Sequence, residues 1–309
     1  DLWFSGRSSA LELTRGELVL GQGKAILRDK PGALIRGKFE DFNWENWRVV
    51  LEKLKIKHAT SSNDYLRGFR AVSLSFDKAD VLNQHYQDLQ IYAQHLPDNI
   101  WSLGIKEAVV SADLKYAPYQ NLLSGSVSAF HLDLPNAETR AADVVKPVGH
   151  PKQLPNLNLK IAALEVGDVN AGQLSLKGTH VSDEIWRLDE GKLKSEAYKL
   201  SATGDWQETP KAETKIDALL QVHDLEKALN HWHISPAIEA HEGNIHLVGE
   251  WDGAPNDFSV KGFTGKMQIM FKEGRIPNLS PETEKKMALG KLLSILSLQT
   301  IPRRLKLDF

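Results

Sequence analysis

Short runs of alternating apolar and polar residues dominate this chain, above all in its second half. Examples are residues 157–161, 173–177, 244–248, 258–261 and 266–271. A period of two puts every second side chain on the same side of a strand, so each run has one apolar and one polar face. We therefore predict a mostly β fold built from antiparallel strand pairs. We expect turns at the glycines between the runs, namely Gly178, Gly191, Gly204, Gly253 and Gly274.

Three segments carry helical patterns instead. Residues 43–55 place apolar side chains at spacings of three and four. Residues 225–232 follow Asp224, a residue type that caps helix N-termini. Residues 281–298 begin with a proline after Ser280 and precede Pro302, which predicts a helix with a defined start and end.

The stretch around residues 135–156 differs from the rest because it is rich in proline and poor in apolar pairs. Its prolines are Pro135, Pro147, Pro151 and Pro155. We expect a loop or linker there. This divides the chain into an N-terminal β segment over 1–134 with a helix near 43–55, a linker over 135–156, and a C-terminal β segment over 157–309 with a helix near 281–298.

A loose internal repeat accompanies the strands of the second half. Gly204-Asp205-Trp206 is echoed by Gly249-Glu250-Trp251, and each is followed by a polar turn and a new alternating run. Repeated strand pairs of this kind predict a sheet that grows by the addition of neighbouring strands.

Composition narrows the class of protein. Of 309 residues 41% are hydrophobic and 25% charged, the formal net charge is −2, and there is no cysteine; the mean hydropathy is −0.34. These values describe a folded chain without the strong basic field of a nucleic-acid binder. The lack of cysteine excludes disulfides, thiolate metal sites and cysteine nucleophiles. No apolar run is long enough to span a bilayer as a helix.

Catalytic and metal-binding motifs are not recognisable. No phosphate-binding loop and no nucleophile elbow occurs. His231, His233, His241 and His246 lie close in sequence, but the spacing of the last two is too long for the zinc motif of metalloproteases. We expect solvated or hydrogen-bonded histidines there, no metal, no cofactor and no enzymatic activity, although a pair of carboxylates brought together by the fold would leave no signal in the sequence.

The apolar side chains of the predicted strands form the main candidate site. Read along the alternation, they are Leu174, Leu176, Leu193, Leu200, Ile216, Leu220, Ile245, Leu247, Phe258, Val260, Met267, Ile269 and Phe271. Two interpretations remain open from periodicity alone. These residues form either the core of a closed sandwich or an apolar channel for acyl chains, in which each buried CH₂ group contributes about 0.8 kcal/mol.

The order of residues in the second half resembles the YhdP-type members of the AsmA-like family of bacterial envelope proteins. The resemblance covers about residues 154–309. It is carried by segments 157–161, 172–178, 186–188, 200–206, 243–245, 249–255, 262–267, 272–276, and 293–299 running into 302–309. The last of these, Leu-Ser-Leu-Gln followed by Pro-Arg-Arg-Leu, is the most specific.

The resemblance implies a long twisted antiparallel sheet that curls into an open groove, apolar inside and polar outside, with a few short helices. It implies a periplasmic protein anchored in the inner membrane that moves phospholipid towards the outer membrane and supports envelope integrity, without catalytic residues. Acyl chains, the inner membrane and envelope proteins are the implied partners. The anchor is missing from this chain, whose start and end read as cuts, so we expect a piece of a longer protein.

The helix at 281–298 has two interpretations in this picture. It caps the groove by burying Leu292, Leu293 and Leu296, or it lies on a membrane surface; its modest basic content favours the cap. For the whole chain, the alternative to a lipid conduit is a closed β scaffold or interaction module of the envelope without lipid. A weaker third alternative is an enzyme acting on envelope glycans.

Overall fold

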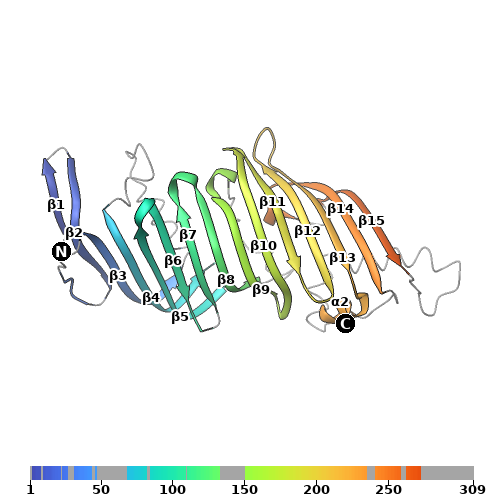
Figure 1. Ribbon diagram of the computed structural model, residues 1–309, viewed down its shortest axis with the longest axis horizontal. Helices are drawn as coiled ribbons and strands as arrows, with labels where there is room; N and C mark the ends of the chain where they lie inside the picture. The colour runs from blue at the N-terminus through green and yellow to red at the C-terminus, as the bar shows by residue number, and fades with distance from the viewer. Residues whose placement is uncertain are drawn as a thin grey trace. The chain divides into compact units, whose positions relative to one another are not determined.

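The computed structural model describes residues 2–7, 10–21, 23–26, 31–43, 46, 68–81, 84–108, 110–132, 150–234, 241–258 and 262–272. The chain divides into two compact units, Asp1–Phe130 and His131–Phe309. Strands dominate both, and in each unit neighbouring strands of the sheet follow the order of the sequence (Figure 1). The prediction of a mostly β fold is confirmed.

The first unit contains β1 to β8. Their bounds are β1 Leu2–Arg7, β2 Ala10–Gly21, β3 Gly32–Asn43, β4 Phe69–Val81, β5 Gln84–Leu96, β6 Ile100–Lys106, β7 Ser111–Ala117 and β8 Leu122–Leu132, with short 3-10 turns η1 at Pro97–Asn99 and η2 at Pro118–Gln120. β1 pairs antiparallel with β2, and the strands from β4 to β8 form an antiparallel meander.

Two neighbouring pairs in this unit depart from the antiparallel prediction. β2 and β3 run parallel, and so do β3 and β4. Apolar alternation has the same period of two in parallel and antiparallel strands, so the pattern alone did not indicate the direction.

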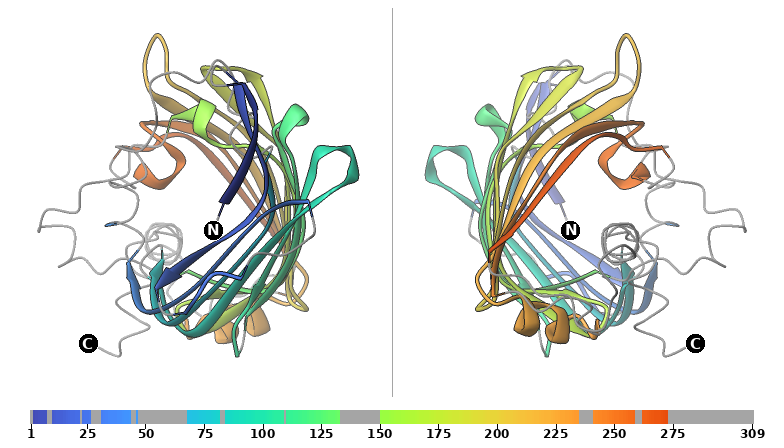
Figure 2. Two further views of the ribbon diagram at one scale, coloured as in Figure 1. Left: turned by 90° about the vertical axis from the view of Figure 1, so that its left-hand side faces the viewer. Right: turned by 90° about the vertical axis from the view of Figure 1, so that its right-hand side faces the viewer.

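The second unit contains a fully antiparallel meander from β9 to β15. Their bounds are β9 Asn156–Val166, β10 Val169–Ser182, β11 Ile185–Lys194, β12 Tyr198–Gln207, β13 Glu213–Val222, β14 Glu242–Asp252 and β15 Thr264–Lys272. Within the described residues β15 pairs with β14 only, so the sheet is open. Figure 2 shows that its strands are strongly curved.

Three of the glycines that we expected at turns lie inside strands. Gly178, Gly191 and Gly204 are within β10, β11 and β12, and they continue the strand pairing. At Gly178 and Gly204 a neighbouring group approaches so closely that a Cβ would not fit, as described below. Gly253 is at a turn as expected, after β14, with a φ of +100°.

The predicted helix after Asp224 is confirmed. α2 (Leu225–His231) begins where the Asp224 side chain accepts a hydrogen bond from Lys227 N, and it connects β13 to the region before β14. The predicted helices at 43–55 and 281–298 lie outside the described residues, apart from Asn43 at the end of β3 and Asn46. Much of the predicted linker, residues 135–149, also lies outside them. Its last part forms the 3-10 turn η3 (Pro151–Gln153), in which Pro151 is buried.

Candidate functional site

The strand registers of the second unit align its apolar side chains into rows that cross the strands. The first row, here called the aliphatic row, has one large aliphatic residue on each strand from β9 to β15. Its members, each directly opposite the next, are Ile161, Leu174, Leu193, Leu200, Leu220, Ile245 and Ile269.

Two further rows lie beside it on the same face of the sheet. The middle row has large residues at both sides and small ones in the centre: Leu159, Leu176, Gly191, Ala202, Ala218, Leu247 and Met267. The glycine row follows: Leu157, Gly178, Leu188, Gly204, Ile216, Gly249 and Gly265. We call the side of the sheet that carries these three rows the apolar face.

The opposite side of the same strands is charged and is here called the polar face. Arg187, Asp205, Lys215 and Glu250 stand opposite one another on β11 to β14, so the sign of the charge alternates from strand to strand. Arg187 Nε lies 2.7 Å from Asp205 Oδ1. This hydrogen bond raises the pKa of Arg187, and a hydrogen bond to Glu213 raises the pKa of Lys215. These residues line an open hollow of about 780 Å³.

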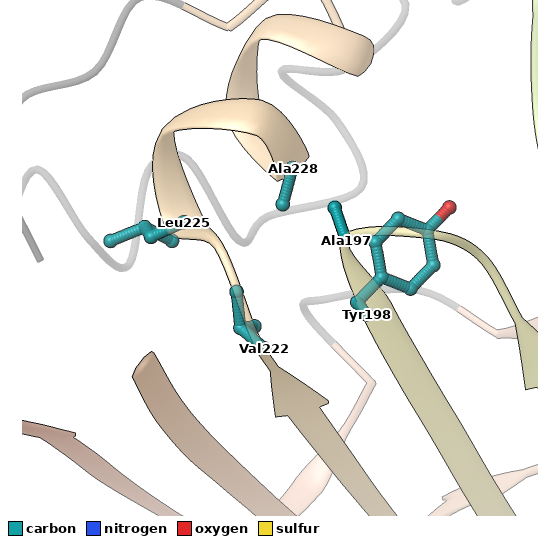
Figure 3. Close-up of a cluster of buried hydrophobic side chains, with 5 residues drawn as sticks. All are labelled: Ala197, Tyr198, Val222, Leu225 and Ala228. Atoms are coloured by element: carbon teal, nitrogen blue, oxygen red, sulfur yellow. The ribbon is translucent and has the colours of Figure 1, made fainter. Parts of the chain in front are cut away.

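At one end of the strands α2 covers the apolar face. Ala197 and Tyr198 at the start of β12, Val222 at the end of β13, and Leu225 and Ala228 of α2 form a buried cluster (Figure 3). Burial raises the pKa of Tyr198, and its hydroxyl donates a hydrogen bond to Ala171 O at 2.9 Å. A packed helix therefore covers the apolar face at this end of the strands.

At the other end a row of aromatic residues is covered by two short turns. Trp186 and Trp206 are directly opposite each other, and Trp251 follows across Thr214. The covering turns are η3 and η4 (Pro255–Asp257), which lie on the inner side of the curved strands in Figure 2. The first and last indoles are hydrogen bonded to backbone carbonyls, as shown by the 3.1 Å from Trp186 Nε1 to Pro155 O and the 3.0 Å from Trp251 Nε1 to Ala254 O.

Between these two covered ends the apolar face is only partly buried. Ile161, Ala218 and Ile245 are buried, whereas the other large residues of the aliphatic and middle rows are half-buried and Met267 is 39% exposed. A sheet face that carries three rows of mainly apolar residues without full burial is unusual for a closed core. We call this partly buried apolar band, which crosses the curved strands from β9 to β15, the trough.

Ten of the residues singled out from the sequence lie on these three rows. Leu174, Leu193, Leu200, Leu220, Ile245 and Ile269 are in the aliphatic row, Leu176, Leu247 and Met267 in the middle row, and Ile216 in the glycine row. Phe271 is opposite Gly243 on the same face and packs against the cluster under α2.

Phe258 is placed differently from the expectation. It follows η4 outside any strand and packs edge-on against Trp251, with ring centroids 5.1 Å apart, so it belongs to the covered aromatic end. Val260 and the predicted cap residues Leu292, Leu293 and Leu296 lie outside the described residues.

The sequence reasoning missed the contribution of β9 and of the first unit. Leu157, Leu159 and Ile161 extend the three rows by one strand, and their alternation in 157–161 was the available signal. In the first unit two similar rows cross β4 to β8: Leu74, Ile91, Ile105, Ala112 and Val127, and beside them Val72, Ala93, Leu103, Leu114 and Gly125.

Three of the four clustered histidines contact partners of their own. His231 Nε2 lies 2.6 Å from Asn170 O, His233 faces Asp168 at 3.7 Å, and His246 Nε2 lies 2.7 Å from Asp217 Oδ1 on the polar face. Among the described residues no group of histidines and carboxylates has the arrangement of a metal site.

The fold and the trough define a class of protein: an open, curved β sheet with one apolar and one charged face. The chain belongs to the YhdP family, because the family model described as YhdP protein matches residues 2–309. The comparisons with curated proteins and with solved structures gave no match. No helix in the described part of the chain combines the length and apolarity needed to cross a membrane.

Proposed function

We propose that this chain is a non-enzymatic segment of a phospholipid conduit in the bacterial envelope. Membership of the YhdP family supports an envelope role. The observation that carries the lipid assignment is the half-buried apolar trough, which crosses seven strands from β9 to β15 between two covered ends.

The physical basis of the proposal is the match between a trough of this kind and an acyl chain. Each CH₂ group that leaves water contributes about 0.8 kcal/mol, so an acyl chain of ordinary length is held without any specific polar contact. The headgroup stays in water on the open side. Neighbouring strands present equivalent apolar rows. An acyl chain that moves along the trough therefore replaces each lost contact with a similar one.

The proposal also covers where the full-length protein lies in the envelope. The conduit extends through the periplasm from an inner-membrane anchor, carries phospholipid towards the outer membrane and works with other envelope proteins. Its residues supply a path for the lipid, and no step requires a catalytic group, a cofactor or a metal.

Two methionines on β15 offer a matched test. Met267 is in the middle row of the apolar face and is 39% exposed, whereas Met270 projects from the polar face and is 56% exposed. We expect Met267→Asp to reduce co-purifying phospholipid at least about tenfold, because a charge in the trough must be desolvated when an acyl chain covers it. Met270→Asp should leave the lipid content unchanged.

The measurement is lipid extraction and mass spectrometry of the chain purified without detergent, with far-ultraviolet circular dichroism as the control for folding. Equal lipid in both variants contradicts the trough as the binding site. A wild-type chain without lipid, which also takes none from added vesicles, contradicts the conduit and favours a scaffold or interaction module.

A further inference from the structure

We propose that α2 is a hinged flap along one side of the trough, where it covers the ends of β12 and β13, and that phospholipid loading requires it to leave the sheet. This inference rests on the proposed function and adds a regulatory element to the same site. It follows from three features of α2: how each of its ends is attached, what lies beneath it, and how small the buried contact is.

The N-terminal end of α2 is attached through backbone hydrogen bonds. His223 N and Asp224 N both donate to Ala197 O, at 2.8 and 3.3 Å, and Leu225 N donates to His241 O at 3.1 Å. Asp224 has the extended backbone conformation of an N-cap, with φ −151°. The helix therefore starts from a fixed point directly after β13, where a rotation of one or two residues would swing it away from the sheet.

The C-terminal end is attached through side chains to the β9–β10 turn and its neighbourhood. His231 Nε2 lies 2.6 Å from Asn170 O. Trp232 Nε1 donates to Tyr198 Oη at 3.2 Å, and Tyr198 Oη donates to Ala171 O at 2.9 Å. We call these hydrogen bonds the latch. Because they belong to side chains, they can be broken without loss of any strand pairing.

Beneath α2 lie residues that continue the apolar face. Leu193 and Leu220 of the aliphatic row pack against the cluster, together with Phe271. When the helix leaves, these side chains and Val222 are exposed, and the trough becomes one row wider at this end. An acyl chain that binds there replaces the apolar contacts of the helix, which lowers the cost of holding the flap open.

The docked helix depends on a small contact. α2 has seven residues, and a helix of this length is not stable in isolation. Its buried side chains are Leu225 and Ala228, and Leu229 and Trp232 pack against the same cluster; Ile234, which follows the helix, is also buried. On the opposite side of the trough the aromatic row is attached differently, because two indoles lie under turns and donate hydrogen bonds to backbone carbonyls.

The absence of cysteine from the sequence allows a direct test by cross-linking. Ala197 and Ala228 belong to the same buried cluster, one beside β12 and one on α2 (Figure 3). The double variant Ala197→Cys, Ala228→Cys locks the flap when oxidised and releases it when reduced. The control pair Thr203→Cys, Asp217→Cys joins directly opposite residues of β12 and β13 on the polar face, away from α2.

The readout is the rate at which each purified chain takes a fluorescent phospholipid from phosphatidylethanolamine–phosphatidylglycerol vesicles. We expect the oxidised flap variant to load at least about fivefold more slowly than its reduced form, and the control pair to load at the same rate in both forms. Equal rates for the oxidised and reduced flap variant overturn the flap and leave the conduit intact. No loading by any form, wild type included, overturns the conduit and the flap together.

A second variant keeps the test decisive if the cross-linked chain does not fold. Tyr198→Phe removes the hydroxyl that joins Trp232 to Ala171 and preserves the packed ring. The variant removes two latch hydrogen bonds, those to Ala171 O and from Trp232 Nε1, and only the second attaches α2. Loss of that attachment, worth about 1 kcal/mol, should speed loading about fivefold. Unchanged loading by this variant overturns the flap.

Discussion

Single glycines in this sheet are explained by the aromatic rings that lie over them. A Cβ at Gly178 would come within 2.2 Å of the Trp186 ring, and one at Gly249 within 2.3 Å of the Phe263 ring. Gly204 is different, because there the close group is the carbonyl oxygen of Lys215 at 2.4 Å. The glycine of each Gly-Asp-Trp or Gly-Glu-Trp repeat belongs to the glycine row, where another group lies too close for a Cβ. Its tryptophan belongs to the neighbouring row of aromatic residues.

Gly178→Ala tests this packing. The new methyl group must displace the Trp186 indole, so we expect a destabilisation of about 1–3 kcal/mol, as is typical of an overpacked site. Urea unfolding followed by tryptophan fluorescence measures it. Gly191→Ala is the matched control, because its nearest neighbour, Leu188 Cδ2, is 3.3 Å away and is a flexible side-chain end; equal losses in both variants would contradict the role of the indole.

Glu17 is a buried carboxylate that joins β2 to the connection that follows it and to β3. Its carboxylate is fully buried, accepts a hydrogen bond from Ile26 N at 2.5 Å, and pairs with Arg36 Nε at 3.0 Å. Arg36 also donates to Lys24 O at 2.7 Å. Glu17 and Arg36 therefore hold the connection that makes β2 and β3 parallel.

We expect Glu17→Ala to destabilise the first unit by about 2–3 kcal/mol, the range for hydrogen bonds to charged groups, because Ile26 N and Arg36 lose their partner. Hydrogen exchange of the β2 and β3 amides would report it. Glu40→Ala, an exposed position on β3, serves as the control and should be nearly neutral. Exchange rates that rise equally in both variants would contradict the proposed clamp.

Among the secondary-structure elements, α2 has a cap that responds to pH. The hydrogen bond from Lys227 N lowers the pKa of Asp224 in the folded helix. The carboxylate therefore stabilises α2 fully above the ordinary aspartate value of about 3.9, and this contribution is lost as the pH falls through the lower folded value.

The expected result is a looser α2 in the acid range, visible as a shift of the Lys227 amide resonance that titrates below pH 4. Asp224→Asn retains a capping side chain without a titrating group, so its Lys227 amide should not follow this titration. A titration that persists in Asp224→Asn would assign the shift to another group.

The whole molecule is organised by pairing between neighbours in the sequence. In the second unit the strands from β10 to β14 each pair with the strand before and the strand after, and β15 pairs with β14, so the sheet joins strands that are neighbours in the sequence. Architectures of this kind retain the structure of a part when another part is removed.

We therefore expect residues 131–309 alone to fold into the same curved sheet and to capture phospholipid. Circular dichroism and lipid mass spectrometry of this fragment, compared with the entire chain, check the expectation. A fragment that is unfolded, or folded but lipid-free while the entire chain carries lipid, would show that the first unit is needed for the site.

The sequence by itself determined that the second unit is built from strands, which of their side chains share a face, and where α2 begins. These properties depend on local sterics: side chains alternate along a strand with a period of two, and Asp224 caps the helix that follows it. The same alternation placed ten of the candidate residues on the trough.

Only the tertiary structure decided the direction of β3, the alignment of the rows and the two covered ends of the apolar face. Strand direction and register depend on partners distant in the sequence, and the close approach of Trp186 to Gly178 depends on both. For the same reason Phe258 became part of a covering turn instead of a strand: its partner Trp251 is fixed by the pairing of β14 with β13, which periodicity does not contain.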